Sequence, residues 1–149
     1  MSGFLLDTNV ISMLSPSRAD ASKTLIDWAE DQDSQDQLYL SAVTIHEIEK
    51  GIASLESKGA SAKAAAIRLW LAGLTTAYDD RILPITTAVA ALSGQLEARA
   101  IASGHSPGMS DALIAGCAKS HDLTIVTHNL RHFQPFEVAA ISPRDIGAT

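Results

Sequence analysis

The stretch GFLLDTNVISML, residues 3–14, places an acid directly between a short apolar run and the start of an amphipathic segment. Residues 3–6 are typical of a short buried strand, and residues 8–15 of a short helix stopped by Pro16. Asp7 is therefore expected where a strand ends and a helix begins. In an open parallel sheet, ligands bind beyond that end of the strands.

The same alternation of strand and helix patterns continues along the chain. Apolar runs predict further strands, and apolar residues at helical spacing predict further helices. The predicted strands are residues 38–41, 82–85, 124–127 and 138–141, and the predicted helices are 21–31, 43–55, 60–78, 87–103 and 110–121. This order predicts an α/β three-layer sandwich with a central, mostly parallel sheet covered by helices. Pro84 suggests that its strand is an edge strand or ends there.

Two polar or glycine-containing segments, 32–37 and 104–108, are predicted loops. The length of 149 residues favours one domain, which we assign to residues 1–145, with a short C-terminal tail at 146–149.

Composition narrows the class of protein. Hydrophobic residues make up 46% and charged residues 19%, as in an ordinary globular domain. Cys117 is the only cysteine, and neither a signal peptide nor a long apolar span is evident, so we expect a cytoplasmic protein with no membrane association. The net charge of −6 argues against coating nucleic acid by charge alone. It does not exclude an enzyme that approaches nucleic acid through a metal ion.

Further acids follow the predicted strands. Glu47 lies on the helix after strand 38–41, and Asp111 begins the helix after the loop SPGMS. Asn129 follows strand 124–127. We expect these positions to converge with Asp7 on one edge of the sheet.

Each acid also has a purely structural explanation. Asp7 could cap a helix, Thr44 and Glu47 match a capping box, and Asp111 could face the helix dipole. Together, however, several acids in one cleft would repel one another, and a divalent cation removes that repulsion. Mg²⁺ is the natural candidate, because it takes one or two carboxylates and keeps several waters.

Other polar and aromatic residues give weaker signals. The five histidines form no recognised metal spacing, and those nearest a predicted strand end are His128 and His132. Cys117 falls on an apolar helix face and is expected in the core. Aromatic residues are 5% of the chain, so no stacking platform for bases is predicted.

Four motifs, in this order and spacing, resemble the PIN-domain family, and most closely the VapC-type (FitB-like) toxins of bacterial toxin–antitoxin pairs. They are LLDTNV (5–10), SAVTIHEIEKG (41–51), SDALIAGCA (110–118) and IVTHNLRHF (125–133). The likeness runs from about residue 4 to about residue 145.

The resemblance implies an Mg²⁺-dependent endoribonuclease, with Mn²⁺ as an alternative ion. Asp7, Glu47 and Asp111 would be the metal-binding and catalytic acids, and Asn129 would assist. Thr8 and Asn9 would orient the first carboxylate or a metal-bound water.

The resemblance also implies partners: an RNA substrate, with transfer RNA or another structured RNA as the first candidate, a cognate antitoxin, and a second copy of the chain in a homodimer. Trp28, Trp70 and the helix 60–78 are predicted interface material.

The chain departs from the family pattern at two places. The fourth motif has Asn129 and His132 where relatives carry acids, and Thr86 and Thr87 follow the strand 82–85, where many relatives also carry one. The predicted site therefore has three acids rather than four.

Two alternatives remain open at this point. One is a non-catalytic PIN-like module that binds RNA or a partner. The other is a phosphatase of the haloacid-dehalogenase type, which needs a second acid two residues after the first, where this chain has Asn9.

Overall fold

A computed structural model describes residues 3–15 and 21–146 of the chain. The described strands are β1 (Phe4–Leu6), β2 (Leu38–Ser41), β3 (Ile82–Leu83), β4 (Thr124–Val126) and β5 (Ala140–Ile141). The described helices are α1 (Thr8–Met13), α2 (Lys23–Ser34), α3 (Ala42–Ser57), α4 (Ser61–Tyr78), α5 (Thr87–Ala102), α6 (Met109–Ser120) and α7 (Leu130–Phe133). Every predicted strand and helix is thus present, most of them somewhat shifted at their ends. The predicted stop at Pro16 lies outside the described residues.

The strands form one sheet in the order β3-β2-β1-β4-β5, and every pairing is parallel. Leu6 pairs with Val126, and Val126 pairs with Ile141. The residues that follow these three strands therefore leave the sheet side by side at its carboxyl edge. β3 is an edge strand and ends just before Pro84, as predicted, because proline cannot donate to the next strand.

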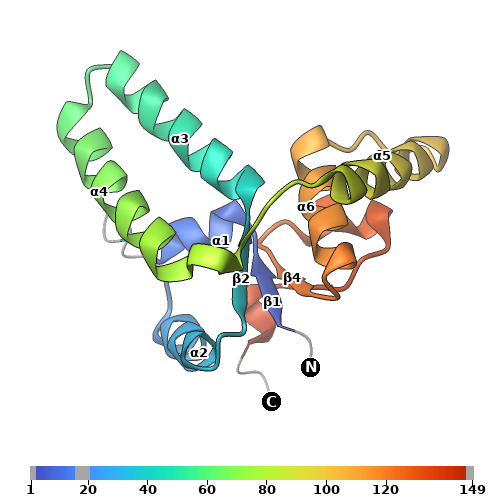
Figure 1. Ribbon diagram of the computed structural model, residues 1–149, viewed down its shortest axis with the longest axis horizontal. Coiled ribbons are helices and arrows are strands. Elements are labelled where there is room, and N and C mark those ends of the chain that lie inside the picture. Colours follow the sequence, from blue (N-terminus) through green and yellow to red (C-terminus); the bar gives the residue numbers. More distant parts are fainter. Residues whose placement is uncertain (1–2, 16–20, 147–149) are drawn as a thin grey trace.

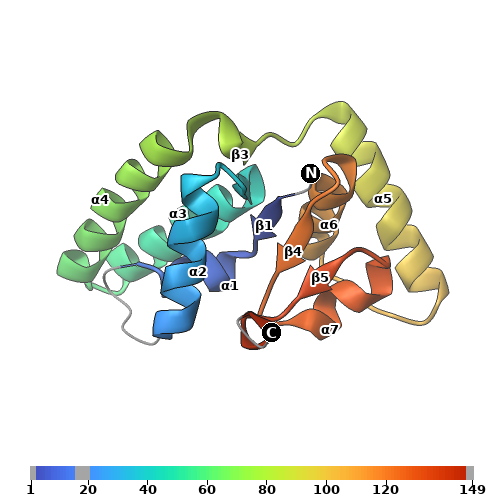
Figure 2. The same ribbon diagram turned by 90° about the horizontal axis from the view of Figure 1, so that it is seen from below.

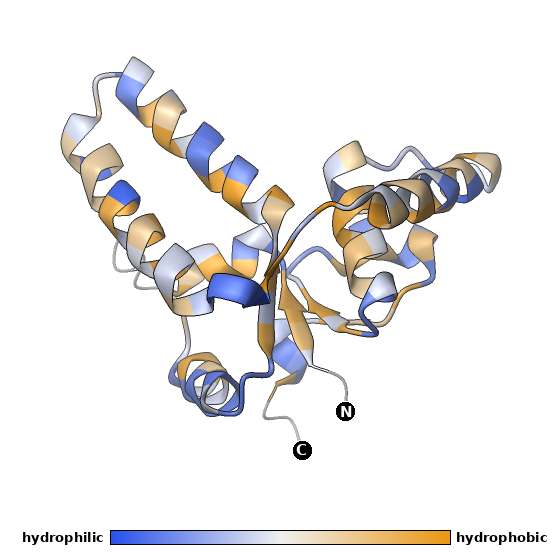
Figure 3. Cartoon of the chain, viewed as in Figure 1, coloured by the Kyte–Doolittle hydropathy of each residue, from blue (hydrophilic) through white to orange (hydrophobic). Residues whose placement is uncertain are grey.

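Helices cover both faces of the sheet, which confirms the three-layer α/β fold (Figures 1 and 2). Alternate strand residues point to opposite faces. In β1, Leu5 joins a core with residues of α5 and α6, whereas Leu6 joins a second core with residues of α1 to α4. Figure 3 shows that the central strands are predominantly apolar, as expected when both faces are buried.

The helices α3 and α4 pack as a hairpin to one side of the sheet, and α5 and α6 pack together on the other (Figure 1). Polar side chains fix where several helices begin. Ser22, Ser41 and Thr86 each accept a hydrogen bond from a backbone N–H in the first turn of the helix that follows.

The predicted loop at 32–37 is wrong in its first half, because α2 continues to Ser34. The polar residues that suggested a loop face solvent from the helix instead. The Asp33 carboxylate is also held by Arg81, whose Nη1 lies 3.1 Å away. The turn comes at Asp36, which has a left-handed backbone with φ of 55°.

Cys117 is fully buried in the core, as predicted. Ile146, the last described residue, is also buried and packs with the α1–α4 core. Where the domain ends and a tail begins stays a prediction. Within the described residues, no helix is both long and apolar enough to span a membrane.

Candidate active site

Asp7 stands at the carboxyl end of β1 and is 6% exposed. Its backbone N–H continues the sheet by donating to the carbonyl of Val126, 2.9 Å away. Its side chain caps α1 by accepting from the Thr8 backbone N–H at 2.8 Å. The other carboxylate oxygen accepts from the Thr127 hydroxyl, also at 2.8 Å. Strand, helix and neighbouring strand together fix this carboxylate in one position.

Glu47 reaches the same edge from the second turn of α3. One of its carboxylate oxygens accepts a 2.6 Å hydrogen bond from the Thr8 hydroxyl, which also lies 3.0 Å from the Thr44 hydroxyl. The capping box predicted for Thr44 and Glu47 is wrong, because the N-cap of α3 is Ser41, three residues before Thr44. Glu47 therefore serves no N-cap of α3, and its contact is with the residue next to Asp7.

Asp111 lies in the first turn of α6, where the helix dipole favours an acid. Its carboxylate is partly exposed and lies 3.2 Å from Nδ1 of His132. His132 stands at one of the two positions where the fourth acid is missing. The fourth motif therefore places His132 against the third acid, at a position where the family resemblance implied another carboxylate.

The three acids act on one another electrostatically. Burial raises the pKa of Asp7 above its ordinary value, and the charges of Asp111 and Glu47 raise it further, while the hydrogen bonds from Thr127 and Thr8 oppose the rise. Burial also raises the pKa of Asp111, with His132 opposing the rise and Glu47 adding to it. Asp7, Glu47 and Asp111 are thus brought to one place, as the sequence predicted.

Asn9 and Asn129 both take part in hydrogen bonds of the loop after β4. The side-chain oxygen of Asn9 accepts from the His128 backbone N–H at 3.3 Å, so Asn9 holds the loop after β4. Its role toward the Asp7 carboxylate or a metal-bound water stays a prediction. Asn129 is exposed, and its backbone N–H donates to the Thr127 hydroxyl at 2.9 Å. In the described part of the chain, no hydrogen bond joins the Asn129 side chain to the acids.

Thr127 and His132 are the two contacts of the acids that sequence reasoning did not assign. Thr127 belongs to the fourth motif, and its position directly after β4 could have indicated that it lies at the site. The signal for His132 was the departure from the family pattern, but only the fold shows that it meets Asp111.

The donor set suits a hydrated divalent cation. Among residues 3–15 and 21–146, no three or more His, Cys, Asp and Glu side chains form a ready-made metal cluster. Mg²⁺ does not require one, because one or two carboxylates and several waters complete its octahedral shell. Mutual repulsion between Asp7 and Asp111 supplies the electrostatic reason for such an ion to bind.

Comparison with known proteins adds independent evidence. Residues 4–136 match the family model for the PIN domain. The chain is 34% identical to toxin FitB of Neisseria gonorrhoeae, over 93% of this chain and 96% of that protein. It is 32% identical to VapC ribonuclease Y4jK of Sinorhizobium fredii, over 92% of each chain. The crystal structure of FitAcB from Neisseria gonorrhoeae superposes with a TM-score of 0.81 at 32% identity, covering 95% of this chain and 98% of that one.

Proposed function

Because the chain belongs to the PIN-domain family, we propose that it is the toxin of a type II toxin–antitoxin pair and acts as a metal-dependent endoribonuclease. The observation that carries the proposal is the convergence of Asp7, Glu47 and Asp111 at the carboxyl edge of the sheet, where Asp111 and Glu47 raise the pKa of Asp7 and Glu47 raises that of Asp111. The cation is Mg²⁺, with Mn²⁺ as a substitute, and the protein acts in the cytoplasm.

The chain's own residues prepare the reaction. Thr127 and Thr8 hold the Asp7 carboxylate in place, and Asp111 faces the same site from α6. Asp7 and Asp111 would hold a divalent cation, which would supply a more acidic bound water and stabilise charge on the departing oxygen of a phosphodiester.

Glu47, oriented by the Thr8 hydroxyl, positions the attacking water, and Asn129 assists from the loop after β4. The new bond joins the water oxygen to phosphorus, and the bond from phosphorus to the 3′ oxygen breaks. The products are a 5′-phosphate and a 3′-hydroxyl, with the leaving oxygen taking up a proton.

The substrate is RNA, and transfer RNA is the first to test. With few aromatic side chains to stack on bases, recognition depends on the shape and backbone of the RNA.

The experiment is cleavage of bulk transfer RNA by purified protein freed of antitoxin. It is run with Mg²⁺, with Mn²⁺ and with chelator, beside an Asp7→Asn preparation purified identically. We expect cleavage that needs the metal and is lost in Asp7→Asn. Folded protein that cleaves nothing with either metal would favour the binding-only module, and His132 beside Asp111 would then be the structural reason.

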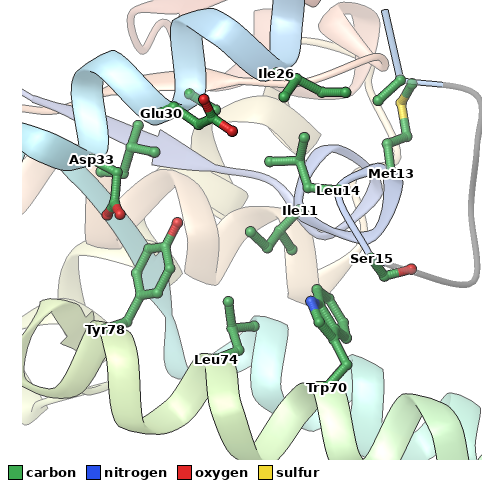
Figure 4. Close-up of a pocket in the computed structure, with 13 residues that line it drawn as sticks. Ile11, Met13, Leu14, Ser15, Ile26, Glu30, Asp33, Trp70, Leu74 and Tyr78 are labelled. Atoms are coloured by element: carbon green, nitrogen blue, oxygen red, sulfur yellow. The ribbon is translucent and has the colours of Figure 1, made fainter. Parts of the chain in front are cut away.

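We propose that the antitoxin binds in an apolar groove. An apolar groove of about 400 Å³ runs between α1, α2 and α4, with Ile11, Trp70, Leu74 and Tyr78 turned toward it (Figure 4). Exposed apolar grooves of this kind mark binding sites. The prediction that Trp70 belongs to an interface is consistent with this groove, whereas Trp28 packs edge-on against Phe4, 5.0 Å between ring centres.

Ile26 offers a test of the groove that leaves the core intact, because it lines the groove and is 38% exposed. Ile26→Glu should weaken binding of the co-purified antitoxin by about tenfold or more. The matched control is Leu69→Glu, since Leu69 is an exposed apolar residue of α4 that does not line the groove. Equal affinity in the two variants would contradict this placement. Homodimer formation, expected from the family, remains to be tested by the mass of the purified protein in solution.

A further inference from the structure

A second hollow, distinct from the antitoxin groove, opens at the carboxyl edge of the sheet, where its lining residue His132 contacts Asp111. Its volume is about 410 Å³. We call it the basic hollow, because arginine and histidine make up half of its lining. The lining residues are His128, Asn129, Leu130, Arg131, His132, Ser142, Arg144 and Asp145.

The fold places the basic hollow next to Asp7. Asp7, Thr127 and Ser142 directly follow β1, β4 and β5, which are adjacent parallel strands in that order. Backbone hydrogen bonds continue this row, from Asp7 N–H to the Val126 carbonyl and from Thr127 N–H to the Ile141 carbonyl. Two strand spacings, or roughly 10 Å, therefore separate Asp7 from the wall of the hollow at Ser142. His132 belongs to both places, because it lines the hollow and contacts Asp111.

The charge of the basic hollow is available for a ligand. Arg68 and Arg81 elsewhere in the chain are held by acids, at 3.1 Å in each case. Within the residues that the structure describes, Arg131 and Arg144 have no such ion pair. The one acid of the lining, Asp145, accepts a hydrogen bond from the Ser142 backbone N–H.

The lining also indicates which part of a nucleic acid fits. Leu130 is its single apolar residue, and the lining contains no Phe, Tyr or Trp ring on which a base could stack. Its only rings are the imidazoles of His128 and His132, which contact Met13 and Asp111. Arginine binds phosphate oxygens through paired N–H groups, and such contacts position a strand without reading its sequence.

Resting on the ribonuclease function proposed above, we propose that the basic hollow binds a backbone phosphate of the RNA strand close to the bond that is cut. Arg131 and Arg144 hold this phosphate and set the register of the strand against Asp7, Glu47 and Asp111. They are positioning residues, and they do not touch the reacting phosphorus.

Binding of bulk transfer RNA to protein carrying Asp7→Asn, measured without divalent metal over a series of salt concentrations, tests the proposal. Adding Arg131→Ala and Arg144→Ala together should weaken binding about tenfold or more and reduce the slope of log affinity against log salt by about 0.7 to 1, as expected for one lost phosphate contact. A purely structural role would leave that slope unchanged.

The control is Lys119→Ala, which removes one positive charge from the last turn of α6, at the end of that helix away from Asp111. It should change neither the affinity nor the slope. A double arginine variant that keeps its fold and the slope of its parent would overturn the proposal.

Two further measurements distinguish failure of the phosphate subsite from failure of the ribonuclease function. In protein with Asp7 intact, the double variant should raise KM for RNA cleavage more than it lowers kcat. Unchanged KM at every salt concentration, with cleavage still metal-dependent, would remove the phosphate subsite and leave the ribonuclease standing. Protein that neither binds nor cleaves the RNA would remove both. If inorganic phosphate shifts the Arg144 amide resonance but the arginine variants bind RNA normally, the hollow binds free anions and the proposal is wrong.

Discussion

The β1 side and the α6 side of the site hold their carboxylates in different ways. Asp7 is almost fully buried, and its hydrogen bonds come from neutral donors, the Thr127 hydroxyl and the Thr8 backbone N–H. The Asp111 side chain is 27% exposed and is met by His132, which can carry a positive charge. Neutral donors fix the position of a carboxylate but leave its charge uncompensated. The uncompensated negative charge that would attract a cation is therefore greatest at Asp7, while His132 reduces it at Asp111.

The largest expected effect comes from removing either charge. Asp7→Asn and Asp111→Asn should each lower the rate of RNA cleavage by on the order of 10³-fold, because each removes a proposed metal ligand. Asp7→Asn and Asp111→Asn should differ in how they change the pH dependence of stability. The raised pKa of Asp7 means that the folded protein binds more protons than the unfolded chain as pH rises above 3.8, the ordinary value for aspartate.

Metal-free protein should therefore lose stability as the pH rises from 3.8 through the pKa that Asp7 has in the folded protein. Asp7→Asn should remove most of this loss, and Asp111→Asn a smaller part, because His132 lowers the pKa of Asp111. Urea unfolding between pH 4 and pH 7 measures the difference. Equal pH dependence in the wild type and Asp7→Asn would break the distinction between the two sides.

A smaller effect is expected at the hydroxyl that orients Asp7. Thr127→Val keeps the shape of the side chain but removes the donor to the carboxylate, so activity should fall about 10- to 100-fold, as for residues that orient metal ligands. The pKa of Asp7 should rise further. Thr124→Val, at the start of β4, makes the same chemical change away from the site and should leave the cleavage rate unaltered. A similar loss in both variants would point to strand packing instead.

The smallest effect is expected at His132. His132→Glu restores an acid at a position where the family pattern has one, and should lower the Mg²⁺ concentration for half-maximal cleavage by about tenfold, because a carboxylate replaces a group that can be positive. His132→Gln serves as the control, since it keeps a hydrogen-bonding side chain without adding charge. If the two variants need the same Mg²⁺ concentration, the moderating role of His132 is contradicted.

The two sides also differ in how far the sequence predicted them. Asp7 follows an apolar run and precedes a helix, so local pattern was enough to place it at a strand end. The contact between Asp111 and His132 joins residues on different helices. It depends on how α6 and α7 pack, which periodicity does not encode.

The predicted capping box failed for a local reason. The box at Thr44 and Glu47 matched a capping motif, but the hydroxyl of Ser41 caps α3 earlier, which leaves Glu47 for the site. The hydrogen bond from the His128 backbone to Asn9 was not predicted either, because it depends on the parallel pairing of β1 with β4.

The central claim is that Asp7 carries an uncompensated charge that a divalent cation relieves. The most direct test is the pKa of the Asp7 carboxyl group, followed by carbon-13 NMR in metal-free protein and again with Mg²⁺, with Asp7→Asn used to assign its resonance. We predict a pKa above the ordinary value without metal and a marked fall when Mg²⁺ is added. An Asp7 that titrates at its ordinary value, and does so identically with and without Mg²⁺, would contradict the account.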